Sequence, residues 1–211
     1  AAQQTLEEFL KWPIYDVLHQ EKAIEAEYMT VCTAYYLKHN NRLELITDFL
    51  ARHPETSHAN HLYTLAGNIH YTNERYDRAL EYYNQCDLEL LSNDERDEST
   101  LFKAISLLKT GDLQEAYTLL TVVQMCSQEL ESDARYYKAY IDYTYNRYEE
   151  AMPALQTLAT HSKYGHQVPY YIADIQLQQK NYAEAKQTAL KYLNEHSKDE
   201  YTNEMTRIAG E

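Results

Sequence analysis

A short phrase returns along the chain at a nearly constant spacing, and this repetition limits the fold more than any other feature. The phrase consists of a polar turn, an aromatic residue or Leu, two further residues and Ala. Its four copies end at Ala79, Ala116, Ala151 and Ala185, which are 37, 35 and 34 residues apart (79 to 116, 116 to 151, 151 to 185). A unit of this length cannot bury an apolar face alone, so the units must stack on one another.

Each copy of the phrase lies between two stretches with helical periodicity. Before the first copy, Leu62, Leu65 and Ile69 follow one another at three- and four-residue steps, and Leu80 and Tyr83 continue this spacing after it. Such steps place apolar side chains on one face of a helix. The sequence therefore predicts an all-α fold in which each repeat is a helical hairpin.

Small residues recur at one position of each predicted first helix. They let the second helix of the hairpin, which carries the Ala of the phrase, approach closely. These small residues are Gly67, Ala104, Ala139 and Ala173.

The repeats resemble those of the tetratricopeptide-repeat (TPR) family. The matching residues in the clearest copy are Tyr63, Ala66, Gly67, Tyr76, Ala79 and Tyr83. A period near 34 is typical of this family, and the T-P-L-H phrase of ankyrin repeats is absent. The resemblance implies a right-handed α-solenoid of stacked antiparallel helix hairpins, a TPR superhelix, with residues 1–211 forming a single TPR array.

The array divides into repeats of unequal quality. We expect a partial repeat at 1–12, a degenerate repeat at 21–54, repeats at 57–91, 95–127, 130–162 and 166–196, and the start of a further repeat at 199–211. The chain begins without Met and inside an expected helix, which predicts a fragment of a longer protein. The lack of a signal peptide here therefore says nothing about the compartment of the parent protein.

In the TPR family the first helices line a concave, ligand-binding face. By the family register the candidate contacts for a partner are Asn68, Tyr71, Tyr136, Tyr140, Tyr143, Tyr170 and Asp174. Tyrosines are good anchors for peptides because they combine a large ring with a polar tip. The alternative is that these tyrosines only pack one repeat against the next. Tyr192, on a second helix, is expected to be a surface residue outside the groove.

The charge balance excludes some partners and leaves others open. With 33 acidic and 19 basic residues the formal net charge is −14, which repels the phosphate backbone of nucleic acids. The acidity serves either solubility or a groove for a basic partner. A Lys-Asn-Arg clamp for a peptide carboxylate, known in some TPR domains, is not expected. Only Asn68 and Lys109 match it, and the positions for further cations hold Tyr136, Tyr140 and Asp174.

The sequence contains no grouping that predicts chemistry. A phosphate-binding Gly-rich loop, a G-x-S-x-G elbow and an H-E-x-x-H motif are all missing. His58 and His61 are three residues apart, but the sequence fixes no third metal ligand. Cys32, Cys86 and Cys126 form no CxxC pair, and we expect the latter two to be buried thiols. The chain is therefore predicted to be no enzyme and to need no cofactor or metal.

The expected function is that of a protein-protein interaction scaffold that binds a peptide or protein segment in the concave groove. The alternatives are a structural spacer in a longer array and the sensor region of a signalling protein. The phrases at 136–143 and 169–173 also resemble large TPR proteins of the Bacteroidetes cell envelope. That resemblance implies an exported parent acting in the periplasm or at the outer membrane. No apolar run is long enough for direct membrane insertion of this segment.

Overall fold

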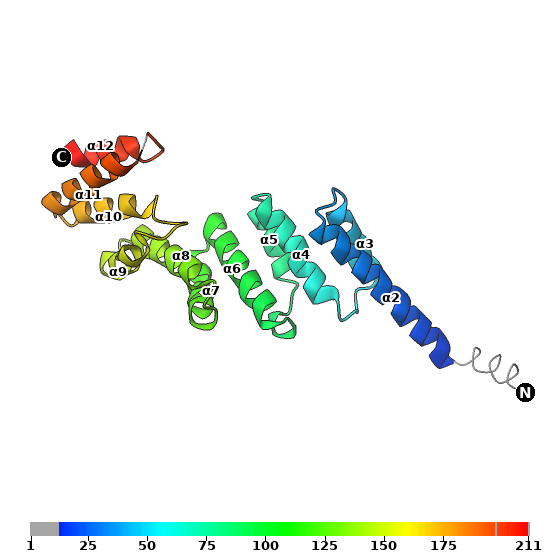
Figure 1. Ribbon diagram of the computed structural model, residues 1–211. Helices are drawn as coiled ribbons and strands as arrows, with labels where there is room; N and C mark the ends of the chain where they lie inside the picture. The colour runs from blue at the N-terminus through cyan, green and yellow to red at the C-terminus, as the bar shows by residue number, and fades with distance from the viewer. Residues whose placement is uncertain (1–12, 197, 211) are drawn as a thin grey trace, which may run out of the picture. The chain divides into compact units, whose positions relative to one another are not determined.

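The computed structural model describes residues 13–196 and 198–210, and their regular structure is entirely helical (Figure 1). The predicted partial repeat at 1–12 lies outside the described residues. The helices are α2 (Pro13–Tyr36), α3 (Arg42–Arg52), α4 (Ala59–Thr72), α5 (Tyr76–Tyr83), the 3-10 helix η1 (Leu88–Leu90), α6 (Asn93–Thr110), α7 (Leu113–Cys126), α8 (Glu131–Thr144), α9 (Tyr148–Leu158), α10 (Val168–Gln178), α11 (Tyr182–Glu195) and α12 (Thr202–Gly210).

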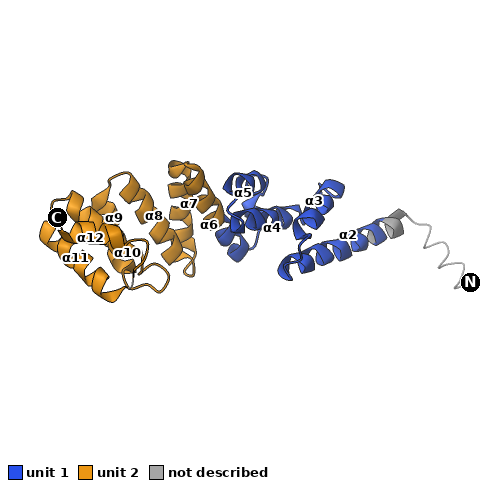
Figure 2. Cartoon of the chain, turned by 90° about the horizontal axis from the view of Figure 1, so that it is seen from above, with its two compact units in different colours: residues 1–99 blue, residues 100–211 orange. Residues whose placement is uncertain are grey.

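The chain forms two compact units, residues 1–99 and 100–211, shown in different colours in Figure 2. In unit 1, α3 packs against both α2 and α4, and α4 packs against α5. Its core contains Val31, Ile46, Phe49, Leu62 and Leu65, which come from α2, α3 and α4.

Unit 2 repeats the same packing between neighbours in the chain. α8 packs against α7 and α9, α10 packs against α9 and α11, and α12 packs against both α10 and α11. The four Ala residues of the repeated phrase, in both units, have no exposed surface. Full burial is what a close helix contact at these positions requires, and the need for a small side chain there stays a prediction.

The turn inside each hairpin has the same backbone conformation. One residue of each turn adopts a positive φ. This conformation lets N–H groups of the turn donate to the last carbonyl groups of the preceding helix, as in a Schellman cap. The residues are Lys38, Glu74, Gly111, Asn146 and Lys180. In the turn after α4, for example, the Arg75 N–H donates to the carbonyl of His70, and Arg147 and Asp142 repeat this bond after α8. The repeat is therefore present in the backbone as well as in the sequence.

Two expectations about burial are wrong. Tyr192 is only 2% exposed, because its ring stacks on His196 at 4.1 Å and its hydroxyl donates to Oδ2 of Asp199 at 2.6 Å. Cys126 is exposed because it is the last residue of α7, and Cys86 is half-buried after α5. Helical periodicity does not describe contacts with residues beyond the end of a helix, such as those of Tyr192 with His196 and Asp199.

None of the described helices is both long enough and apolar enough to cross a bilayer.

Candidate functional site

Half-buried tyrosines from consecutive first helices of unit 2 form the most distinctive surface of the described chain. They come from α8, from α10 and from the residue before α12. We call this surface the tyrosine face, and it consists of Tyr140, Tyr143, Tyr170, Tyr171 and Tyr201.

Ring contacts hold the tyrosine face together. The centroids of Tyr140 and Tyr171 lie 5.8 Å apart, and those of Tyr143 and Tyr171 lie 5.1 Å apart. Tyr170 stacks on Tyr201 with a centroid distance of 5.2 Å. Each contact joins α8 to α10, or α10 to the residue before α12, in edge-to-face or stacked geometry that is favourable for aromatic pairs.

Asp174 lies beside these rings and is 8% exposed. It shares a face of α10 with Tyr170, four residues earlier. The Tyr143 hydroxyl donates to Oδ2 of Asp174 at 2.7 Å, and Gln178 Nε2 donates to Oδ1 at 3.4 Å. Burial, followed by the hydrogen bond to this carboxylate, raises the pKa of Tyr143, so the phenol remains a donor. Among the described residues, two uncharged groups thus donate hydrogen bonds to Asp174: the phenol of Tyr143 and the amide of Gln178.

The structure groups only part of the predicted groove. Tyr140, Tyr143, Tyr170 and Asp174 lie together, whereas the ring of Tyr136, 6% exposed, stacks on Tyr164 at 4.1 Å in the core. Tyr136 therefore offers little surface to a partner.

The two remaining groove residues belong to unit 1. Asn68 is 8% exposed and accepts a hydrogen bond from the buried Tyr83 hydroxyl at 2.7 Å. Tyr71 makes an edge contact with Tyr76, at a centroid distance of 6.0 Å. Asn68 thus closes the α4–α5 hairpin. A partner's contact with any of the seven residues stays a prediction.

The sequence prediction omitted two members of the tyrosine face. Tyr171 follows Tyr170 directly, and the family register favoured only one of them. Tyr201 precedes α12 in the incomplete last repeat, where no anchor phrase fixes the register. The signal that could have found Tyr201 is its place 31 residues after Tyr170 (170 to 201), close to one repeat length.

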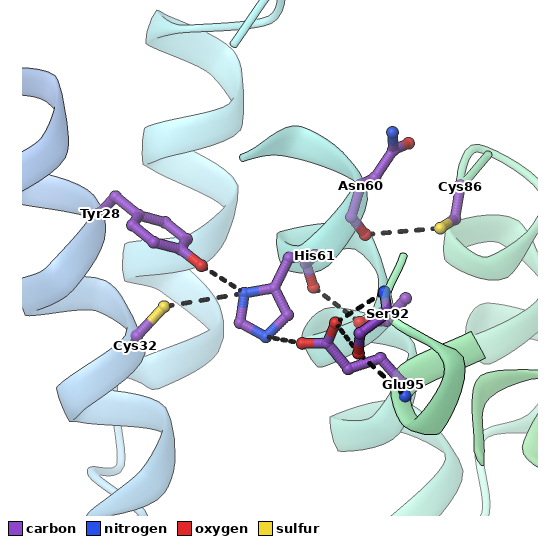
Figure 3. A network of polar contacts seen from close by, with 8 residues as sticks. Tyr28, Cys32, Asn60, His61, Cys86, Ser92 and Glu95 are labelled. Atoms are coloured by element: carbon purple, nitrogen blue, oxygen red, sulfur yellow. Dashed lines mark hydrogen bonds and ion pairs between the residues drawn. The ribbon is translucent and has the colours of Figure 1, made fainter. Parts of the chain in front are cut away.

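A polar network within unit 1 joins α2, α4 and the start of α6 (Figure 3). Nδ1 of His61, on α4, lies 2.7 Å from the Tyr28 hydroxyl and 3.9 Å from Sγ of Cys32, both on α2. Nε2 of His61 lies 3.3 Å from Oε1 of Glu95 on α6. Ser92 Oγ donates to the other oxygen of Glu95 at 2.7 Å, at the start of α6.

This network groups a thiol, an imidazole and a carboxylate, but its geometry opposes nucleophilic chemistry. The Tyr28 hydroxyl is much closer to Nδ1 of His61 than the Cys32 sulfur is. Burial raises the pKa of Cys32, which keeps the sulfur as the unreactive thiol. We interpret the network as a structural tie within unit 1 between α2, α4 and the start of α6.

The two histidines considered as metal ligands face different carboxylates. His58 Nε2 lies 2.8 Å from Oε2 of Glu25, whereas His61 pairs with Glu95. Within the described residues no three His, Cys, Asp or Glu side chains are grouped to hold a metal ion.

A cavity of about 590 Å³ in unit 2 was not foreseen from the sequence. It lies between the turn after α9 and the second half of α11, and three histidines line it: His161, His166 and His196. The turn is tightly closed, with the Gly165 N–H donating to the carbonyl of His161 at 2.7 Å. His161 and His166 come from the connection between α9 and α10, and His196 follows α11, so no helical periodicity connects them.

Comparison with known proteins identifies the fold. YrrB, described as a TPR protein with an unusual peptide-binding site, matches with a TM-score of 0.66 and 16% identity, over 82% of this chain and 90% of YrrB. The ArsTM double mutant of MamA RS-1 matches with a TM-score of 0.64 and 13% identity, over 81% of this chain and 93% of MamA.

The C-terminal part of a TPR repeat-containing protein from Cytophaga hutchinsonii matches with a TM-score of 0.58 and 13% identity, over 79% of this chain and 64% of that one. No protein family profile matches the sequence, and no curated protein matches it. The structural likenesses confirm that this is an all-α chain with the tetratricopeptide-repeat solenoid fold.

Proposed function

We propose that this chain is a protein-protein interaction scaffold and that its tyrosine face binds a peptide segment of a partner protein. The observation that carries the proposal is the group of five half-buried tyrosines, which come from successive first helices and contact one another ring to ring. A half-buried tyrosine already has a restricted ring, so it provides contact area and a hydroxyl at low cost in entropy.

The fold supports the same proposal. TPR repeats stack into an extended surface, which suits them to binding rather than to enclosing a reaction. One protein of similar structure, YrrB, is described as having a peptide-binding site. The proposal includes no catalytic step, no cofactor and no nucleic-acid partner. We also propose that the chain acts in the periplasm or at the outer membrane, because its repeat phrases resemble those of Bacteroidetes cell-envelope proteins.

The test begins with selection from a library of random 12-residue peptides on the immobilised chain. Binding of the selected peptides is then measured by fluorescence anisotropy for the wild type and for Tyr140→Ala and Tyr170→Ala. We expect each variant to bind about 10-fold more weakly, the usual effect of losing an aromatic anchor. The matched control is Tyr182→Ala, which removes an exposed tyrosine from the start of α11.

Circular dichroism must show that all three variants are folded. If no peptide is selected, or if the three folded variants bind as the wild type does, the tyrosine face is not a binding site. The spacer function would then be the better account of this chain.

A further inference from the structure

The carboxylate of Asp174 differs from the other well-buried carboxylate of unit 2 in its partners. Asp142 is 5% exposed and lies 2.7 Å from the guanidinium of Arg147. Asp174 is buried to a similar degree, and its hydrogen bonds come from the phenol of Tyr143 and the amide of Gln178. Among the described residues no Lys, Arg or His nitrogen forms an ion pair with Asp174.

A carboxylate withdrawn from water is stabilised only in part by neutral donors. Charge-assisted hydrogen bonds to a cation are roughly twice as strong as those between neutral groups. A buried carboxylate without a cationic partner also carries a desolvation penalty that the attraction of an incoming cation offsets. The electrostatics at Asp174 therefore favour an external ammonium or guanidinium group.

The rings beside Asp174 favour the same kind of ligand. Tyr143 donates to the carboxylate, and Tyr170 lies one helical turn before it on α10. The face of a tyrosine ring attracts cations, and this attraction is strongest where water is excluded. A lysine or arginine side chain could place its apolar stem along the rings and its charged end toward the carboxylate.

The charges around the tyrosine face do not oppose this ligand. Arg207 of α12 is a basic residue near Tyr170, and its Nε lies 2.9 Å from Oε2 of Glu204. Glu200 lies near Tyr171 and Tyr201. With a net charge of −14, the whole chain attracts a basic segment over longer distances.

We propose that Asp174, together with Tyr143 and Tyr170, forms the subsite for a lysine or arginine side chain of the bound segment. This inference rests on the proposed function, because it assigns the charge of the partner at the tyrosine face. If it holds, the acidity of the chain serves to bind a basic partner and not only to keep the chain soluble.

The decisive variant is Asp174→Asn, which removes the charge and keeps an oxygen that can accept from Tyr143. The matched control is Glu184→Gln, which removes one negative charge from an exposed position on α11. The same peptide library is selected on the wild type and on both variants. Anisotropy is measured for one selected peptide and for its copies with Lys or Arg replaced by Gln.

We expect the peptides selected by the wild type to share a lysine or arginine at one position. Asp174→Asn should bind them about 10- to 100-fold more weakly, the effect of losing a hydrogen bond between charged groups. Glu184→Gln should bind them as the wild type does. Replacing the shared basic residue by Gln should weaken binding to the wild type but hardly alter binding to Asp174→Asn.

Two other outcomes would separate the inference from the proposed function. Peptides that depend on Tyr140 and Tyr170 but show no basic preference, or bind Asp174→Asn unchanged, would overturn the subsite and leave the tyrosine face as a binding surface. The absence of any peptide that depends on these tyrosines would overturn both. Equal weakening by Asp174→Asn and Glu184→Gln would show a long-range effect of charge and would also contradict the subsite.

Discussion

The ring of Tyr83 occupies the space that a side chain at position 67 would need. A Cβ added to Gly67 would lie 2.4 Å from Cε1 and 2.7 Å from Cδ1 of this ring. The ring cannot easily move away, because Tyr83 is buried and its hydroxyl donates to Asn68. The hairpin of α4 and α5 therefore closes on a position that has no room for a methyl group.

Gly67→Ala should lower the free energy of unfolding by about 1 to 3 kcal/mol, which is the usual cost of overpacking a core. The direction of this change in unfolding free energy is informative, because Ala otherwise stabilises a helix interior by about 1 kcal/mol relative to Gly. Chemical denaturation followed by circular dichroism measures the effect. Gly210→Ala is the control, since a Cβ there meets nothing within 4 Å. Equal stability of the two variants would contradict the close contact.

Ala151→Leu should also destabilise the chain by about 1 to 3 kcal/mol, because Ala151 is fully buried among the helices of unit 2. The matched variant is Ala183→Leu, which makes the same change at an exposed position of α11. Denaturant midpoints are compared at constant pH. If Ala151→Leu unfolds at the wild-type midpoint, the alanine of the repeated phrase does not mark the helix contact.

Unit 1 should lose stability as the pH falls. Burial lowers the pKa of His61 below its ordinary value of 6.5, against a smaller opposing effect of Glu95. The unfolded chain therefore binds more protons at this histidine than the folded chain does. The stabilising contribution is complete above about pH 6.5 and is lost as the pH falls through the lower folded pKa. Burial lowers the pKa of His70 in the same direction.

The measurement for His61 is the denaturant midpoint at about pH 7.5 and about pH 5, taken on either side of the ordinary histidine pKa. The midpoint should fall less for His61→Gln than for the wild type. His39→Gln, at an exposed position, should follow the wild type. An identical fall for wild type and His61→Gln would show that this histidine does not couple protonation to folding.

Gly165→Ala should disturb the turn that lines the cavity of unit 2. An added Cβ would lie 2.8 Å from the carbonyl oxygen of His161 and 3.0 Å from that of Ala159, and backbone atoms cannot swing aside as a side chain can. We expect a loss of about 1 to 3 kcal/mol in unfolding free energy. Ser162→Ala, in the same turn, is exposed and should have little effect. A Gly165→Ala variant as stable as Ser162→Ala would contradict this close packing.

The fold was predictable because the repeat is expressed in local chemistry. Helical spacing, small residues at contacts such as Ala79 and Ala151, and regular turns all point to stacked hairpins. The positive φ at four non-glycine turn residues was not predictable, because Lys38, Glu74, Asn146 and Lys180 belong to three different residue types and no one type marks the position. There the Schellman hydrogen bonds offset the cost of a conformation that these side chains rarely adopt.

The candidate site was less predictable, since it depends on contacts between repeats. Helical register placed Tyr140, Tyr143 and Asp174 on one surface, but it cannot distinguish a half-exposed ring from a buried one. The ring of Tyr136 is buried because Tyr164 lies on it, and Tyr164 belongs to an irregular turn that periodicity does not describe. The burial of Tyr192 arises in the same way, from His196 and Asp199 beyond the end of α11.

The first helices are joined by different forces in the two units, and the difference should appear when ionic strength changes. In unit 1 the contacts include His58 with Glu25 and His61 with Glu95, which are ion pairs only while the histidine is protonated. Their attraction then weakens once dissolved ions shorten the Debye length to a few ångströms. In unit 2 the stacked rings of Tyr170 and Tyr201 carry no net charge. Where His58 is protonated, molar sodium chloride should therefore weaken its tie between α2 and α4, while the uncharged contact of Tyr170 with Tyr201 persists. A sulfate salt would strengthen that second contact further, because it makes apolar surface harder to hydrate.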